Sequence, residues 1–177
     1  MKRPETARTQ HGRRRSRQAF GPWARVWLVL AALPMALALA QPVPPPPPAA
    51  DARCPVCGMQ VAPHKAWLAT IIFTTGKRVD FDGPKDMFRY YFDLAKFEKK
   101  LGPKDIREIW VTDYYTAKPV DARTAWFVAG SDVLGPMGHE LVPVAGKQES
   151  VSFRTDHHGL EVLSFAGVTR SVVEAIE

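Results

Sequence analysis

The sequence predicts an α+β protein built from two similar hairpin-plus-helix units with antiparallel sheets. Three observations support this class. Short β-branched or alternating runs predict strands, and apolar residues at helical spacing predict helices. A pattern of glycine and phenylalanine from the first half of the chain also recurs near its end. A late recurrence of this kind is typical of folds that arose by duplication.

The first unit is predicted from a run of hydrophobic residues that is interrupted by turn residues. A strand over residues 67–73 is followed by a turn at 74–77 and a second strand at 78–81. A helix is expected to begin at Gly83 and Pro84, because proline is favoured in the first turn of a helix. The sequence Leu101-Gly102-Pro103 ends it, and two further strands are expected at 106–111 and 126–129.

The last quarter of the chain is predicted to repeat this hairpin and helix. We expect a strand at 151–154, a turn at 158–159, a strand at 160–165 and a helix over 168–176. The alignment matches residues of the first unit to residues of the second within one position of spacing: Gly76, Phe81 and Gly83 with Gly159, Phe165 and Gly167. The domain therefore divides into subunits at about 53–120 and 121–177.

The first 40 residues are predicted to be a signal peptide. A basic segment at 13–17 precedes an apolar run at 27–40, which is too short for a transmembrane helix but typical of a signal-peptide core. Ala38-Leu39-Ala40 is a cleavage site, and no cysteine follows it, so the chain is not an evident lipoprotein. We expect a periplasmic or otherwise extracytoplasmic protein. The alternative is an uncleaved segment that gives membrane association.

Residues 41–52 are predicted to be a proline-rich spacer, because consecutive prolines favour an extended chain. The net charge of +6 does not predict nucleic-acid binding. Residues 1–40 hold eight of the 24 basic residues and one of the 18 acidic residues, which leaves 16 basic and 17 acidic residues elsewhere. The predicted domain, residues 53–177, thus carries no basic excess, and we expect no nucleic-acid partner.

Two short segments carry residues that bind soft metal ions. Cys54 and Cys57 precede Met59, and thiolate with thioether selects Cu(I) over zinc. Met137 and His139 lie in a loop rich in glycine and proline, where a methionine is poorly explained by burial in a core. These five residues are the candidate metal ligands, and no catalytic residues are predicted.

Two other interpretations of the cysteine pair remain open. The cysteines could join two histidines in a structural zinc site. They could also form the redox pair of a thiol-disulfide oxidoreductase, although such a pair normally opens a helix, and Gln60-Val61-Ala62-Pro63 does not predict one. His157 and His158 are expected at a solvated turn, and Asp80 and Asp82 as turn or cap residues.

Four blocks of this sequence, in order, resemble the NosL family of copper chaperones for nitrous oxide reductase. The resemblance extends from about Arg53 to the C-terminus. The blocks are Cys54-Pro55-Val56-Cys57-Gly58-Met59, Phe81-Asp82-Gly83-Pro84-Lys85-Asp86-Met87-Phe88, Val111-Thr112-Asp113-Tyr114-Tyr115 and Gly130-Ser131-Asp132-Val133-Leu134-Gly135-Pro136-Met137-Gly138-His139-Glu140.

The resemblance implies a fold of two similar ββαβ units and a role in metal transfer rather than catalysis. It implies delivery of Cu(I), outside the cytoplasm, to nitrous oxide reductase, together with a membrane-bound maturation transporter complex. By position it implies that Cys57, Met59, Met137 and His139 are the Cu(I) ligands. Cys54 is then either a further ligand or the redox partner of Cys57.

Overall fold

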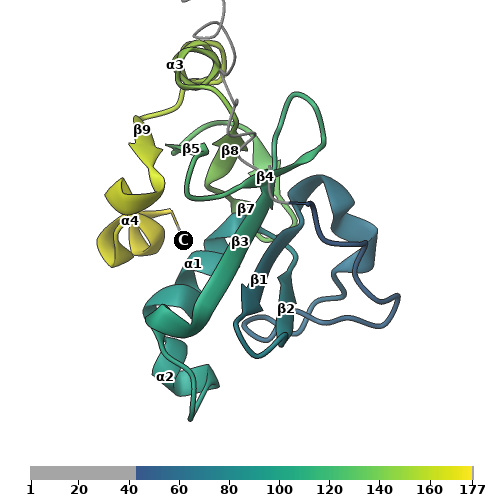
Figure 1. Cartoon of the computed structure of the whole chain (residues 1–177). Coiled ribbons are helices and arrows are strands. Elements are labelled where there is room, and N and C mark those ends of the chain that lie inside the picture. The colour runs from purple at the N-terminus through teal and green to yellow at the C-terminus, as the bar shows by residue number, and fades with distance from the viewer. Residues whose placement is uncertain (1–42, 177) are drawn as a thin grey trace, which may run out of the picture. The chain divides into compact units, whose positions relative to one another are not determined.

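The computed structural model describes residues 43–176, so the predicted signal peptide lies outside the described residues. The first unit is a four-stranded antiparallel sheet in the order β2-β1-β3-β4 (Figure 1). Its elements are the 3₁₀ helix η2 (Ala62–Trp67), β1 (Ala69–Phe73), β2 (Arg78–Phe81), α1 (Pro84–Phe92), α2 (Leu94–Phe97), the 3₁₀ helix η3 (Pro103–Asp105), β3 (Ile106–Thr112) and β4 (Pro119–Asp121).

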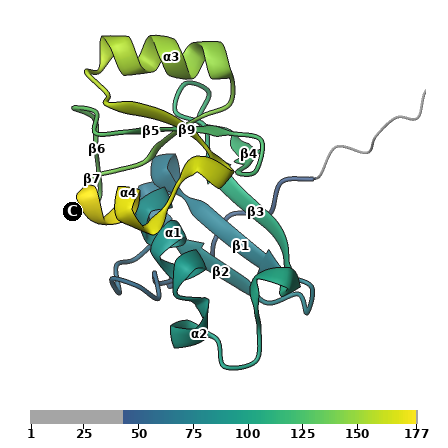
Figure 2. The ribbon, with the colours of Figure 1, turned by 90° about the vertical axis from the view of Figure 1, so that its left-hand side faces the viewer.

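The second unit is a three-stranded antiparallel sheet in the order β8-β5-β9, with a separate small hairpin between β5 and β8. Figure 2 shows α3 lying across this sheet and α4 beside α1. The elements are β5 (Trp126–Ala129), β6 (Leu134–Gly135), β7 (Gly138–His139), β8 (Val142–Val144), α3 (Lys147–Asp156), β9 (Glu161–Ser164), the 3₁₀ helix η4 (Phe165–Gly167) and α4 (Arg170–Ala175).

The predicted α+β class with antiparallel sheets is confirmed, and the two units share one topology. In each unit the first strand is central, the second strand pairs with one edge of it, a helix follows, and the next strand pairs with the other edge. The elements β5, β8, α3 and β9 thus correspond to β1, β2, α1 and β3.

The prediction of a strand at 151–154 is wrong, because these residues lie within α3. Val151 and Phe153 alternate as in a strand, but the buried positions of the segment are Ser150 and Phe153, three residues apart, as on one face of a helix. The glycine alignment was therefore out of register. The segment from Gly159 to Gly167 contains β9, which corresponds to β3, whereas the matched segment of the first unit contains β2.

A core of buried side chains lies between the two units and includes residues of α1, β5 and η4. The Phe88 ring lies 5.1 Å from the rings of both Phe127 and Phe165, measured between centroids. Phe127 and Ala129 of β5 belong to this core, whereas Val128 points to a second cluster with Phe153 of α3. Because side chains of a strand alternate between its two faces, one face of β5 packs on the shared core and the other on the cluster with Phe153.

The described part of the predicted spacer lies on the first sheet. Pro45, Pro46, Pro47 and Pro48 line a hollow together with Trp110 and Thr112 of β3. Arg78 donates from Nη1 to the carbonyl oxygen of Pro46, at 2.6 Å. These prolines therefore contact the domain instead of extending away from it. Among residues 43–176, no helix has the length and apolar character needed to cross a bilayer.

Candidate metal site

The two cysteines lie in a tight turn that reverses the chain before η2. Cys54 N donates to the carbonyl oxygen of Met59, and Gly58 N donates to that of Cys54, both at 2.9 Å. Gly58 has a φ of +79°, a left-handed conformation that favours glycine. Arg53 closes the turn by donating from Nη1 to the oxygen of Gly58, at 3.0 Å. The turn therefore has a defined geometry.

Both thiols point at the N-terminus of α1. Cys54 Sγ donates to Asp86 Oδ2 and Cys57 Sγ donates to Asp82 Oδ1, each at 3.2 Å. One ligand atom from each of these four residues lies within 4.8 Å of the others. Cys54, Asp82 and Asp86 are at most 2% exposed, whereas Cys57 is only half-buried. Cys57 is thus the member of the cluster that solvent reaches.

The surroundings of the thiols favour their protonated forms. Burial raises the pKa of Cys57 to about 11, and the neighbouring Asp86 and Asp82 act in the same direction. Burial also raises the pKa of Cys54, far beyond that of an ordinary thiol, with further contributions from Asp82 and Asp86. At neutral pH both cysteines are therefore thiols that donate hydrogen bonds, and an ion that binds their sulfurs displaces the protons.

The carboxylates of Asp82 and Asp86 differ in their further hydrogen-bond partners. Asp86 Oδ1 accepts from Arg89 Nη1 at 2.9 Å. Asp82 Oδ2 is buried and has no hydrogen-bond partner among the described residues. An unpartnered buried carboxylate oxygen is costly, and a cation at this position would remove that cost. The donor chemistry of the cluster, two sulfurs and two carboxylates, fits a metal ion.

Met137 and His139 lie on the β6–β7 hairpin, and both side chains are exposed. Leu134 pairs with His139 and Gly135 with Gly138, and Gly138 has a φ of +83° at the turn. This hairpin is attached to α1. Lys85 Nζ donates to the carbonyl oxygen of Met137 at 3.1 Å, and the buried Glu140 accepts from the backbone N–H of Lys85.

The structure therefore places the predicted ligands in two groups that meet α1 at its N-terminus. Cys54 and Cys57 join Asp82 and Asp86, and Met59 lies half-buried at the end of the cysteine turn. Met137 and His139 lie on the hairpin. No histidine of residues 43–176 belongs to the four-residue cluster, so the structure gives no support to a Cys2His2 zinc site.

Sequence reasoning missed Asp82 and Asp86. The sequence predicts Asp82 as a turn or cap residue, and it directly precedes Gly83, the N-cap of α1, which makes no side-chain capping bond. No periodic signal links the two aspartates, because Asp82 precedes the N-cap and only Asp86 lies within the helix, in its first turn. His157, which the sequence predicts at a solvated turn, bonds Asp132 Oδ1 through Nδ1 at 3.1 Å.

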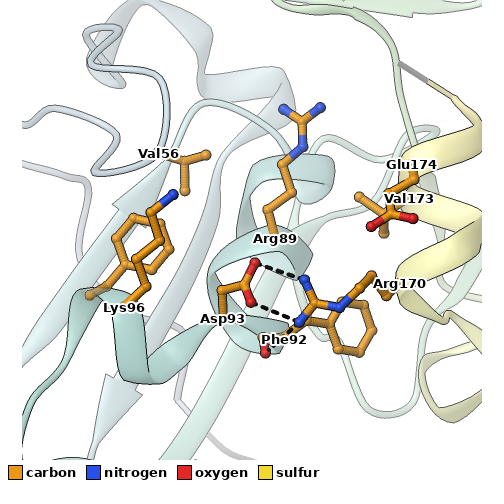
Figure 3. Close-up of a pocket in the computed structure, with 9 residues that line it drawn as sticks. Val56, Arg89, Phe92, Asp93, Lys96, Arg170, Val173 and Glu174 are labelled. Atoms are coloured by element: carbon orange, nitrogen blue, oxygen red, sulfur yellow. Dashed lines mark hydrogen bonds and ion pairs between the residues drawn. The ribbon is translucent and has the colours of Figure 1, made fainter.

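A hollow lies beside the cysteine turn, where Val56 of that turn faces α1 and α4 (Figure 3). Among the residues that line it, Arg170 of α4 makes two hydrogen bonds of 2.8 Å to the Asp93 carboxylate and one of 3.0 Å to the Phe92 carbonyl oxygen. These bonds hold the pKa of Asp93 below its usual value. They fix α4 against the C-terminal end of α1, the helix whose other end meets the cysteines.

Comparisons with known proteins give one family. The sequence model of the NosL family matches residues 45–173. The crystal structure of the copper chaperone NosL from Shewanella denitrificans is similar, with a TM-score of 0.59 and 22% identity over 72% of this chain and 99% of that chain. The solution structure of apo-NosL from Achromobacter cycloclastes gives a TM-score of 0.44 and 26% identity over 59% and 87% of the two chains. No curated protein matches.

Proposed function

Because the chain belongs to the NosL family, we propose that it is an extracytoplasmic copper chaperone that binds Cu(I). The observation that supports this most directly is the meeting of the Cys54 and Cys57 sulfurs in one cluster, because sulfur is the donor that Cu(I) prefers. Asp82 and Asp86 accept from the two thiols and place negative charge beside them, which favours a cation. The similar structure from Shewanella denitrificans is described as a copper chaperone. The ligands in this proposal are Cys57, Met59, Met137 and His139, with Cys54 as a further ligand.

The geometry suits transfer rather than catalysis. Cys57 is half-buried and Met137 is 41% exposed, so an incoming or outgoing ion first meets ligands that solvent and a partner can reach. Cys54 lies deeper, at 1% exposure. Cu(I) prefers soft sulfur ligands, and stepwise exchange of a few such ligands lets the ion pass to a partner without being released to water.

The client in this proposal is nitrous oxide reductase, and the membrane-bound maturation transporter is the second partner. Export through the N-terminal segment would bring the chaperone to the compartment where that reductase matures. Cell fractionation with N-terminal sequencing of the mature protein tests the location. A protein that stays in the cytoplasm with residues 1–40 intact would contradict it.

The copper site is tested by metal binding to the purified protein. We expect one Cu(I) per chain and loss of this binding in Cys57→Ser, as measured by competition with a chromophoric Cu(I) chelator. Cys54→Ser should bind more weakly but still bind. Unchanged stoichiometry and affinity in Cys57→Ser would show that the ligand set is wrong.

The same two variants test the alternative of a thiol-disulfide oxidoreductase. An attacking cysteine of such an enzyme has a lowered pKa, whereas burial and carboxylates raise the pKa of Cys57 here. We therefore expect no disulfide reductase activity in the wild-type protein. Activity that depends equally on Cys54 and Cys57 would favour the enzyme instead.

A further inference from the structure

The segment from Asp82 to Asp86 contacts both halves of the proposed copper site. Asp82 and Asp86 bond the cysteine thiols. Lys85, between them, holds the β6–β7 hairpin through its ammonium and, by its backbone N–H, through Glu140. Five consecutive residues at the start of one helix therefore join two segments that are about eighty residues apart in the sequence.

We propose that Glu140 is a positioning residue that locks the Met137–His139 hairpin onto the N-terminus of α1 and so holds the two halves of the copper site together. The inference rests on the copper-binding function proposed above. Glu140 itself is 3% exposed and follows His139 directly, so the position of its side chain fixes the end of the hairpin.

The first reason is that α1 lacks a cap of its own. Its N-cap is Gly83, which has no side chain to accept from the free N–H groups of the first turn, and Pro84 follows. Glu140 Oε1 accepts from Lys85 N, from a position 55 residues further along the chain, and also from Leu141 N at 2.9 Å.

The second reason is that two glycines, which lack a Cβ atom, make room for the side chain of Glu140. A Cβ atom at Gly83 would lie 2.1 Å from Glu140 Oε2, far inside contact distance. A Cβ at Gly135, on the hairpin itself, would lie 3.2 Å from Glu140 Cγ. Glu140 therefore fits between a glycine of the helix cap and a glycine of the hairpin, and a larger residue at Gly83 would displace it.

The third reason is a second bond from the same helix residue. Lys85 is 3% exposed, and its ammonium donates to the Met137 carbonyl oxygen at 3.1 Å. The hairpin is thus held at two points, Met137 and Glu140, which lie on either side of His139. Holding both ends restricts where the side chains of Met137 and His139 can go relative to the cysteine turn.

The test measures Cu(I) affinity by chelator competition in Glu140→Ala, Glu140→Gln and Lys85→Met. Loss of a group that positions metal ligands costs about 10–100-fold in metal affinity, so we expect a loss of this size in Glu140→Ala and in Lys85→Met. Glu140→Gln should recover most of it, because an amide oxygen accepts the same N–H bonds. The matched control is Glu149→Ala, which removes an exposed glutamate from the first turn of α3.

A double-mutant comparison separates positioning from a general loss of structure. In a Met137→Ala, His139→Ala background the hairpin supplies no ligand side chain, so Glu140→Ala should have no further effect on affinity. An equal loss in both backgrounds, or unchanged affinity in folded Glu140→Ala, would overturn the inference. If circular dichroism shows that Glu140→Ala is unfolded, the Cu(I) affinity of Lys85→Met is compared in the same two backgrounds instead. An equal loss in both, or no loss, would then overturn the inference.

The result is also distinguishable from failure of the proposed function. If Cys57→Ser abolishes Cu(I) binding while Glu140→Ala and Lys85→Met leave it unchanged, only the positioning role is wrong. If Cys57→Ser leaves binding unchanged, the proposed copper site itself fails. X-ray absorption of the copper-loaded Glu140→Ala protein gives a second readout, because a displaced hairpin should remove nitrogen from the coordination of the metal.

Discussion

Cys57, the most accessible thiol in the cluster, forms a hydrogen-bonded pair with Asp82. The thiol donates to Oδ1 of the carboxylate, while Oδ2 has no partner among the described residues. The carboxylate therefore stabilises the protonated thiol in the apo protein and offers an oxygen to a cation. Sequence reasoning identified Cys57 from its neighbours in the chain. It could not identify Asp82, because the contact joins residues 25 positions apart.

Replacing Asp82 by asparagine tests this pair. Removing the negative charge removes one of the causes that raise the pKa of Cys57, so we expect that pKa to fall from about 11 towards its ordinary value. Thiolate absorbance, followed against pH in a Cys54→Ser background, measures it. Asp80→Asn is the control, since Asp80 accepts from Thr70 and Arg78 instead of a cysteine. Equal thiol pKa values in all three proteins would contradict the prediction.

The raised pKa of Cys57 also predicts how stability depends on pH. The folded protein holds the thiol proton more tightly than the unfolded chain, so the contribution to stability is complete below pH 9 and is lost as pH rises from 9 towards 11. We expect the difference in free energy of unfolding between wild type and Cys57→Ser to be constant below this window and to fall within it. Urea titrations at several pH values measure the difference, and a difference independent of pH would refute the prediction.

At the scale of single elements, prediction succeeded where burial follows the local pattern. The runs predicted as β1 and β2 are bounded by turn residues, and β2 alternates between buried and half-buried positions. The prediction of secondary structure failed at α3. There a short alternating run resembled a strand, but only Ser150 and Phe153 are buried. The cap of α1 could not be predicted either, because it comes from Glu140, a residue of another unit.

The assignment of Phe153 to one buried face of α3 is testable. Phe153 is fully buried and packs in a cluster with Val128 and Val144, so Phe153→Ala should lower the free energy of unfolding by about 3–5 kcal/mol. Ser152→Ala, on the exposed side of the same helix, should change it by less than about 0.5 kcal/mol. Urea unfolding measures both variants. Similar losses in the two would mean that the face of α3 has been assigned wrongly.

At the scale of the whole domain, the two units share a core, and the site depends on that sharing. The cysteine turn belongs to the first unit and the Met137–His139 hairpin to the second. Phe88 of α1 packs on Phe127 and Phe165 of the second unit, and the same helix carries the Asp82–Asp86 segment at its start. The sequence indicated two similar units. It could not show that their contact positions both groups of candidate ligands.

A shared core predicts that the two units unfold in one transition. Native-state hydrogen exchange should give the same free energy of global opening for the protected amides of β1 and β3 as for those of β5 and β9. Phe88→Ala opens a cavity between the units and should lower both values together, by about 3–5 kcal/mol, because the lost contacts belong to both. If only the amides of the first sheet lost protection, the units would be separate folding domains. The hairpin would then be able to leave the cysteine turn without unfolding either sheet.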